Sequence, residues 1–296
     1  PRAWTVSMRP RLLHYLMVSP VQLLLASLIL APSVYVGWLS FQHSSYGRAT
    51  EFVGVANYLT LLKDPYFWRS LVNTVVVVNI VVYGELLLGL GIALLFVGGI
   101  PWPRLMFSIV IAPYAISEVV VVVMWKYMFE PQVGIANFAL GGMGLPEVEW
   151  AVNPIHALGL ITLLAIWHHL PFTFMILYTA RLGIPRELYE AAAIDGSGPF
   201  QLFRYVTLRL LMPAILVALL FRYVFAFRMF SEVWLLTQGG PARGTELLAV
   251  YLYKAAFRYH EFGLASATGW AMVIFSLLIA LWYMRIAYRR MFAHDA

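Results

Sequence analysis

Long apolar segments recur six times along the chain, and shorter polar connections separate them. The segments cover roughly residues 13–41, 71–97, 105–129, 155–180, 210–236 and 264–288. A helix needs about 20 mostly apolar residues to cross a bilayer. The runs are continuous rather than alternating, which favours helices over a barrel. The pattern therefore predicts one all-α integral membrane domain over residues 1–296 with six transmembrane helices, and Pro20, Pro32, Pro113 and Pro171 predict kinks in them.

Composition supports lipid as the main solvent of the chain. Hydrophobic residues make up 62% of it and charged residues 11%, whereas soluble domains carry about 25% charged residues. The chain has no cysteine, which excludes disulfides and thiolate metal sites. The first apolar run is too long for a signal peptide and lacks a small-residue cleavage site, so we expect no cleaved leader.

Charge is distributed unevenly between the two sets of connections. The N-terminal tail, the second and fourth connections and the C-terminal tail together carry eleven arginines and four acidic residues. The remaining connections carry seven basic and seven acidic residues. Because positive charge favours the cytoplasmic side, we expect a multi-pass protein with both termini in the cytoplasm. The basic residues lie at membrane edges rather than on one face, so nucleic acid is not an expected partner.

The fourth connection, residues 184–213, has a pattern of its own. Leu188–Ile194 is rich in helix formers. A breaker cluster follows at Asp195–Pro199, and a helical pattern resumes from Phe200 to Leu211. We expect Gly196 to form the turn and the Asp195 carboxylate to cap the turn after it. A short helix, a sharp turn and a second amphipathic helix could dock into a groove of a partner protein.

This connection resembles the EAA loop of ABC importer permeases. The run Glu190-Ala-Ala-Ala-Ile-Asp195-Gly196 matches the motif, with Arg209 as a departure where the family usually has proline. The resemblance implies a type I ABC importer permease fold and a coupling helix that inserts into a cleft of an ATPase subunit. The residues that it assigns to ATPase coupling are Glu190, Ala191, Ala192, Asp195 and Gly196.

Further stretches extend the likeness to the carbohydrate class, in particular to maltose- and trehalose-type permeases. They are residues 52–58, 64–74, 184–189, 237–241 and 253–263. The resemblance implies a transport subunit, not an enzyme, of an importer for a sugar or sugar derivative in a bacterial or archaeal cytoplasmic membrane. Its implied partners are a second permease subunit in a heterodimer, two ATPase subunits and an external solute-binding protein. ATP and Mg²⁺ would bind the ATPase, because this chain has no Walker motif, and no cofactor is expected here.

Ionisable groups inside the spans mark a candidate substrate path, since burying a charge in a bilayer is costly. The maltose-type permease has its substrate contacts on the fourth and fifth spans, and the resemblance carries those positions to this chain. With two intramembrane acids added, the candidates are His168, His169, Phe172, Phe227, Arg228, Met229, Glu232 and Glu118. If the solute is anionic, Arg228 is the expected ligand for it.

Structural roles remain open for the same residues. Arg228 and Glu232 are four residues apart on one predicted helix, so they could form a neutral pair that only locks the span. Each histidine could be a hydrogen-bonded core residue, and adjacent histidines on a helix do not have metal-ligand spacing. Glu118 could serve packing alone. Glu85 lies near Gly84, Gly89 and Gly91, where close helix contacts are possible.

Two other functions explain the sequence less well than an importer subunit does. A proton-coupled secondary transporter could use Glu85, Glu118 and Glu232 as relays, but it leaves the fourth connection unexplained, and no inverted repeat of hydropathy is evident. An intramembrane enzyme lacks support because neither H-E-x-x-H nor G-x-S-x-G occurs.

Overall fold

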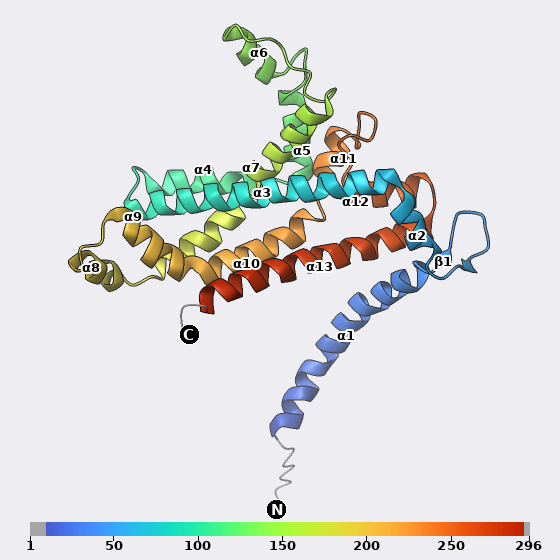
Figure 1. The fold of residues 1–296 in the computed structure, drawn as a ribbon, viewed down its shortest axis with the longest axis horizontal. Coiled ribbons are helices and arrows are strands. Elements are labelled where there is room, and N and C mark those ends of the chain that lie inside the picture. Colours follow the sequence, from blue (N-terminus) through green and yellow to red (C-terminus); the bar gives the residue numbers. More distant parts are fainter. Residues whose placement is uncertain (1–9, 293–296) are drawn as a thin grey trace, which may run out of the picture.

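Long helices dominate the computed structural model, which describes residues 10–292. They are α1 (Pro10–Leu39), α3 (Pro65–Gly98), α7 (Pro154–Leu182), α10 (Leu208–Ala226) and α13 (Phe262–Phe292). Helices α3, α7, α10 and α13 pack into a bundle, whereas α1 meets α13 near Gly37 and Trp270 and then leaves the bundle (Figure 1). The described residues contain five helices that are long and apolar enough to cross a membrane, and up to six if a bent pair counts as one span.

Shorter elements connect the long helices. An antiparallel hairpin, β1 (Gln42–His43) and β2 (Glu51–Phe52), precedes α2 (Ala56–Lys63). Helices α4 (Pro103–Ala115), α5 (Glu118–Met128) and α6 (Ile135–Gly142) link α3 to α7. Helices α8 (Arg186–Ile194) and α9 (Pro199–Gln201) and the π-helix η1 (Leu202–Thr207) lead into α10. Helices α11 (Ser231–Leu236) and α12 (Leu248–Tyr253) and the π-helix η2 (Lys254–Arg258) lead into α13.

Two of the central helices begin with the same local device. Asp64 precedes Pro65 at the start of α3, and Asn153 precedes Pro154 at the start of α7. Each polar side chain accepts a hydrogen bond of 2.8 Å from the backbone two residues later, at Tyr66 and Ile155 respectively. The backbone N–H groups of the first helical turn have no partner within the helix, so proline, which lacks an N–H, is well suited to this position. These pairs therefore determine where both helices start.

The core consists of apolar clusters separated by a polar layer along α3 and α7. One cluster surrounds Val81, Val121 and Leu164, and another surrounds Ala93, Phe174 and Leu211. Between them on the same helices lie the buried polar side chains of Glu85, His168 and Thr173. The layer marks the level at which the bundle holds its ionisable groups.

Glycines allow α3 and α7 to approach closely around Glu85. A Cβ on Gly89 would lie 3.2 Å from the backbone nitrogen of Phe174, and one on Gly84 would lie 2.9 Å from Ile166 Cδ1. A Cβ on Gly91 would meet nothing within 4 Å. The close contact expected near Glu85 therefore involves Gly84 and Gly89 but not Gly91.

The third predicted span is not one continuous helix. Helices α4 and α5 meet at an angle of 98° across Ile116 and Ser117. Pro113 lies in the last turn of α4, where its missing N–H and its ring weaken continuation of the helix. The predicted kink at Pro113 is therefore a break, and α5 leads away from the bundle towards α6 (Figure 1).

The fifth predicted span, residues 210–236, is also wrong as a single helix. Helix α10 ends at Ala226, the backbone is irregular from Phe227 to Phe230, and α11 begins at Ser231. No glycine or proline marks this break, so no turn-forming residue reveals it in the sequence. Non-helical backbone at membrane depth is tolerated where it lines a cavity, and a cavity lies at this point.

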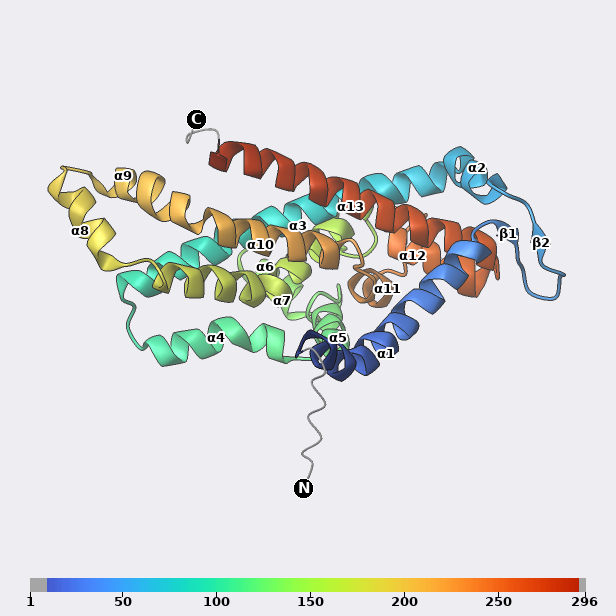
Figure 2. The same cartoon turned by 90° about the horizontal axis from the view of Figure 1, so that it is seen from below.

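The first and fourth connections lie towards opposite ends of the molecule. Helices α8 and α9 and the C-terminal end of α13 point to one end, whereas the β1–β2 hairpin and α2 lie at the other (Figures 1 and 2). Of the charges used to predict orientation, Arg2, Arg9 and Asp295 lie outside the described residues. The orientation in the membrane stays a prediction.

Candidate functional site

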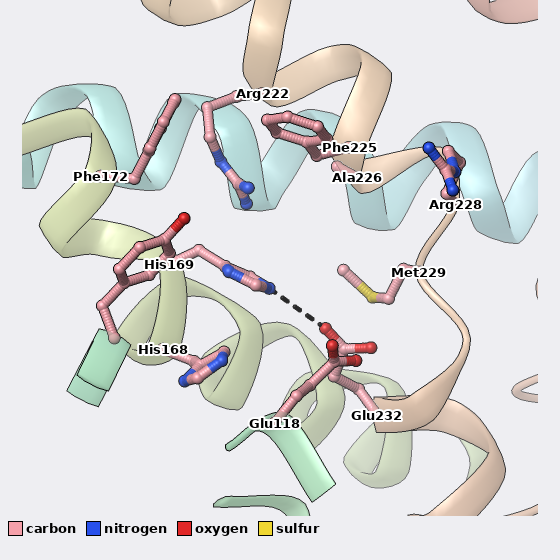
Figure 3. Close-up of a pocket in the computed structure, with 11 residues that line it drawn as sticks. Glu118, His168, His169, Phe172, Arg222, Phe225, Ala226, Arg228, Met229 and Glu232 are labelled. Atoms are coloured by element: carbon pink, nitrogen blue, oxygen red, sulfur yellow. Dashed lines mark hydrogen bonds and ion pairs between the residues drawn. The ribbon is translucent and has the colours of Figure 1, made fainter. Parts of the chain in front are cut away.

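A cavity of about 480 Å³ lies where the two broken helices meet α7. Its walls come from the end of α4, the start of α5, the middle of α7 and the break between α10 and α11 (Figure 3). The lining residues are Tyr114, Glu118, His168, His169, Phe172, Arg222, Phe225, Ala226, Arg228, Met229 and Glu232. The helix breaks therefore create a polar, partly open site inside an otherwise apolar bundle.

One wall of the cavity is acidic. Glu118 is the first residue of α5 and Glu232 the second residue of α11, so each carboxylate lies at a helix start. Figure 3 shows the two carboxylates side by side. Glu232 Oε1 lies 3.3 Å from His169 Nε2, whereas its Oε2 is buried without a hydrogen-bond partner. The first N–H groups of a helix favour negative charge, which helps the bundle to hold these two acids.

Arg222 lines the cavity, and its charge is neutralised by the carboxylate of Glu85. Its guanidinium donates two hydrogen bonds to Glu85 on α3, one from Nε to Oε2 and one of 2.6 Å from Nη2 to Oε1. Thr173 on α7 donates a third bond to this carboxylate, at 3.3 Å. Glu85 and Arg222 are almost completely buried, so the pair joins α3, α7 and α10 at the level of the polar layer.

The sequence prediction of an Arg228–Glu232 pair is wrong. Because α10 ends at Ala226, Arg228 and Glu232 do not share a helix. Among the described residues, Arg228 takes part in no ion pair, and Glu232 is bonded to His169 instead. Arg228 is exposed at the edge of the cavity (Figure 3).

Aromatic rings complete the lining. Phe172 packs against Phe225 with 6.1 Å between ring centroids and against Tyr114 with 6.3 Å. The ring of His168 lies 4.6 Å from that of His169, and its Nδ1 is buried without a hydrogen-bond partner. The cavity therefore combines an aromatic surface with polar atoms that have unused hydrogen-bonding capacity.

The structure brings seven of the eight predicted path residues to this one cavity. The exception is Phe227, which is buried in a separate cluster with Val78, Val82 and Tyr223. Tyr114, Phe225 and Ala226 also line the cavity and were not predicted, whereas Arg222, the remaining lining residue, is an ionisable group inside the predicted fifth span. A continuous fifth helix would place Arg222 and Arg228 on different faces, and only the break at Phe227 turns both towards the same space.

The coupling-loop residues lie far from the cavity, on a projecting helix. Helix α8 has no buried residue. Ile194 and Phe200 are 87% and 70% exposed, so apolar side chains are presented to solvent. Four of the five predicted residues, Glu190, Ala191, Asp195 and Gly196, are exposed, and Ala192 is partly buried. An exposed apolar surface of this kind is typical of a docking site.

The turn after α8 needs glycine at one position. Gly196 has φ of +82°, a conformation that side chains with a Cβ rarely adopt. The expected cap by Asp195 is wrong, because Gly198 is the N-cap of α9 and no side chain caps it by accepting a bond. Instead, the Gln201 side chain accepts a 2.8 Å hydrogen bond from the Gly198 backbone N–H.

A charged cluster holds the last loop before α12. Glu246 is fully buried and forms ion pairs with Arg243 at 2.5 Å and with Lys254 at 2.6 Å. The Asn73 amide on α3 donates to the carbonyls of Gly244 and Glu246. Burial alone would lower the pKa of Arg243, but the hydrogen bonds and charge of Glu246 outweigh it and raise that pKa. The loop is thereby fixed to the end of α3.

No metal centre is found in the part of the chain that the structure describes. No group of three or more histidine, aspartate or glutamate side chains there has a geometry that could hold an ion. The arrangement can instead bind a polar organic molecule through hydrogen bonds and an aromatic face.

Solved structures with the same architecture come from membrane transporters. A chain of a bacterial alginate ABC transporter, solved in complex with an alginate pentasaccharide-bound periplasmic protein, matches with a TM-score of 0.84 at 22% identity. The match covers 94% of this chain and 95% of that one. A chain of the MetNI methionine ABC transporter gives a TM-score of 0.53 over 76% of this chain and 98% of its own. The bundle therefore has the fold of an ABC transporter permease.

Named relatives are similar over nearly the whole chain. The sulfoquinovosyl glycerol transport system permease protein SmoG of Agrobacterium fabrum is 34% identical, covering 96% of this chain and 93% of the relative. The inner membrane ABC transporter permease protein YcjO of Escherichia coli is 36% identical over 90% of both chains. The trehalose/maltose transport system permease protein MalF of Thermococcus litoralis is 31% identical over 93% of both.

The family model agrees with these relatives. Residues 85–293 match the model described as the binding-protein-dependent transport system inner membrane component. The matched region contains the cavity, α8 and the buried ion pair of Arg222 with Glu85. The chain is thus a transport subunit rather than an enzyme, and it belongs to the family of binding-protein-dependent transport system inner membrane components.

Proposed function

We propose that the chain is a permease subunit of an ATP-driven importer for a sugar or sugar derivative and forms half of its translocation path. The observation that carries this proposal is the connection between α8 and the cavity. Residues Pro199–Ala226 form one continuous helical rod, which starts beside the exposed α8 and ends at the cavity wall. Motion of α8 would therefore reach the cavity through a continuous helical segment, as alternating access requires.

The exposed surface of α8 and the family support a proposal for the partners. The exposed apolar side chains of α8 would insert into a cleft of an ATPase subunit, which binds ATP and Mg²⁺. The complex would hold two ATPase subunits and a second permease in a heterodimer, and an external binding protein would deliver the solute. The charge distribution supports placing α8 and both termini in the cytoplasm.

The class of solute is supported by the relatives and by the cavity. The names of two relatives mention a sulfoquinovosyl glycerol and trehalose or maltose as transported compounds. Pockets that hold small ligands combine apolar or aromatic walls with a few placed polar groups. Phe172 offers the aromatic wall, and His169, Arg228 and the two acids offer the polar groups.

Coupling through α8 can be tested with two matched glycine variants. Gly196→Val forces a β-branched side chain into a left-handed backbone and should cost about 1–2 kcal/mol. Gly198 has φ of −74°, so Gly198→Val needs no such conformation. We expect the first variant, but not the second, to lose stimulation of ATP hydrolysis by the loaded binding protein in the reconstituted importer.

A charge reversal on the same helix provides an independent check. Glu190→Lys should also abolish the stimulation, whereas Glu149→Lys, an exposed acid in the loop before α7, should not. Equal amounts of assembled complex must be compared. Normal stimulation in both Gly196→Val and Glu190→Lys would contradict the assignment of α8 as the coupling helix.

A further inference from the structure

Helix α8 is attached to the bundle by one side chain in particular, that of Tyr189. Among the described residues, the side chains of α8 form a single hydrogen bond, and it belongs to Tyr189. No ion pair in the described part of the chain involves α8. No residue of this helix is buried, and only Tyr189 and Ala192 are partly buried. Apart from the backbone, Tyr189 is therefore the main connection between α8 and the rest of the molecule.

The hydroxyl of Tyr189 binds the start of α10. It lies 2.9 Å from Oγ1 of Thr207, and either hydroxyl can donate the hydrogen bond. Thr207 is buried and is the last residue of η1, directly before α10. The backbone route from α8 to the same point passes through the turn at Gly196 and through a π-helix, a rare geometry that is frequent at functional sites. The hydrogen bond therefore joins α8 to α10 directly.

The ring of Tyr189 binds the end of α7. The guanidinium carbon of Arg181, in the last turn of α7, lies 4.2 Å from the ring centroid, which is within the distance of a cation–π contact. Arg181 forms no ion pair among the described residues, and its Nε is buried without a hydrogen-bond partner. The aromatic face therefore gives this cation a partner and holds α8 against α7.

Tyr189 also packs against an apolar cluster that α7 and α10 share. The cluster contains Phe174 and Leu177 from α7 and Leu211 and Ile215 from α10. Further along, the same two helices line the cavity. Because Tyr189 contacts both helices, a displacement of α8 that it carries would act on two walls of the cavity at once.

We propose that Tyr189 is a positioning residue through which α8 transmits its displacement to the cavity, with Thr207 on η1 and Arg181 on α7 as its contacts. The inference rests on the proposed function of the chain as an importer subunit and adds residues to its coupling device. Motif residues such as Glu190 and Gly196 are exposed and available to a partner, whereas Tyr189 contacts the bundle. Without these contacts α8 could move while α7 and α10 stay in place.

Two hydroxyl deletions test the contact with α10. Tyr189→Phe keeps the ring and Thr207→Val keeps the shape, but each removes the hydrogen bond. Each should lower the stimulation of ATP hydrolysis by the loaded binding protein by about threefold to tenfold, the size of one neutral hydrogen bond. The double variant should be no worse than the weaker single variant, because both changes break the same bond. Tyr205→Phe is the matched control, since the Tyr205 hydroxyl is exposed and η1 carries it as well.

A larger deletion tests the contact with α7. Tyr189→Leu removes the ring as well as the hydroxyl, so stimulation should fall below that of Tyr189→Phe. Arg181→Gln should lower stimulation in the parent chain but add nothing to Tyr189→Leu, because the ring that it contacts is already absent. If Tyr189→Leu fails to assemble, the two hydroxyl deletions still decide the outcome.

The measurement uses the complete importer in proteoliposomes, with its own ATPases, second permease and binding protein. The probes are trehalose, maltose, glucose and glucuronate, and the variants are compared with the probe that stimulates the parent most. ATP hydrolysis and uptake of the radiolabelled probe are both expressed per assembled complex. We expect the hydroxyl variants to take up less probe for each ATP hydrolysed, which a purely structural defect would not cause.

Two results would overturn the inference while leaving the import function in place. One is normal stimulation in both Tyr189→Phe and Thr207→Val. The other is a loss confined to the amount of assembled complex, with normal stimulation and normal uptake per ATP in what remains. Failure of every probe to stimulate the parent importer would instead contradict the proposed function itself, and the inference with it.

Discussion

The ion pair between Glu85 and Arg222 shows how a single contact can hold the polar layer together. Glu85 has no exposed surface and Arg222 is 3% exposed. A buried pair adds little net stability, but removing one partner leaves an uncompensated charge at a cost of about 3–5 kcal/mol. Replacing one member of the pair should therefore lower stability more than replacing both.

We predict that Glu85→Gln destabilises the chain more than the double substitution Glu85→Gln with Arg222→Gln. In the single variant Arg222 keeps its charge but loses the carboxylate to which it is bonded, whereas in the double variant two amides can bond to each other. Thermal unfolding of the detergent-purified importer measures the difference, with Glu147→Gln, an exposed acid, as the control. Equal destabilisation in the single and double variants would show that Glu85 acts through other contacts.

At the scale of elements, α3 and α7 form the frame that supports the cavity. Gly84 and Gly89 on α3 face α7 closely: a Cβ would lie 2.9 Å from Ile166 Cδ1 at Gly84 and 3.2 Å from the backbone nitrogen of Phe174 at Gly89. Small residues that let helix backbones approach are a common device for packing in membranes. The residues His168 and His169, which contribute to the cavity wall, lie on α7 between the Ile166 and Phe174 contacts.

Two glycines on α3 offer a matched test of this frame. Gly89→Val would bring side-chain atoms against the backbone of Phe174 and should push the helices apart at a cost of about 1–3 kcal/mol. Gly91→Val points into open space and should be nearly neutral. Thermal unfolding of the purified importer would show the difference, and a Gly89→Val protein as stable as the parent would contradict the close packing.

At the scale of the whole molecule, the orientation of the bundle decides which end lies in the cytoplasm, where an ATPase subunit could bind. Helices α8 and α9 and the C-terminal end of α13 point towards the same end (Figures 1 and 2). The exposed tip of the α5–α6 arm, which contains Gly144, projects elsewhere. A topology measurement can therefore use one site of each kind.

We predict that a reporter active only outside the cytoplasm is inactive when fused after residue 296 and active when inserted after Gly144. The expectation follows from the excess of arginines on the connections assigned to the cytoplasm. Enzymatic activity in intact cells, normalised to the amount of fusion protein, gives the answer. Strong activity of the C-terminal fusion would reverse the orientation.

The local pattern of the sequence determined the helices, the coupling-loop motif and the family, because periodicity and turn residues act over a few neighbouring positions. It placed α7 and α8 within two residues of their ends and identified Gly196 as the turn, whereas α3 begins six residues before its predicted start. Only the tertiary structure decided where two apolar segments break and which charges meet. The break at Phe227–Phe230 has no glycine or proline, and Glu85 and Arg222 are 137 residues apart. Packing between distant segments selects such contacts, so the cavity, the unpaired oxygen of Glu232 and the separation of Arg228 from it became visible only in the folded chain.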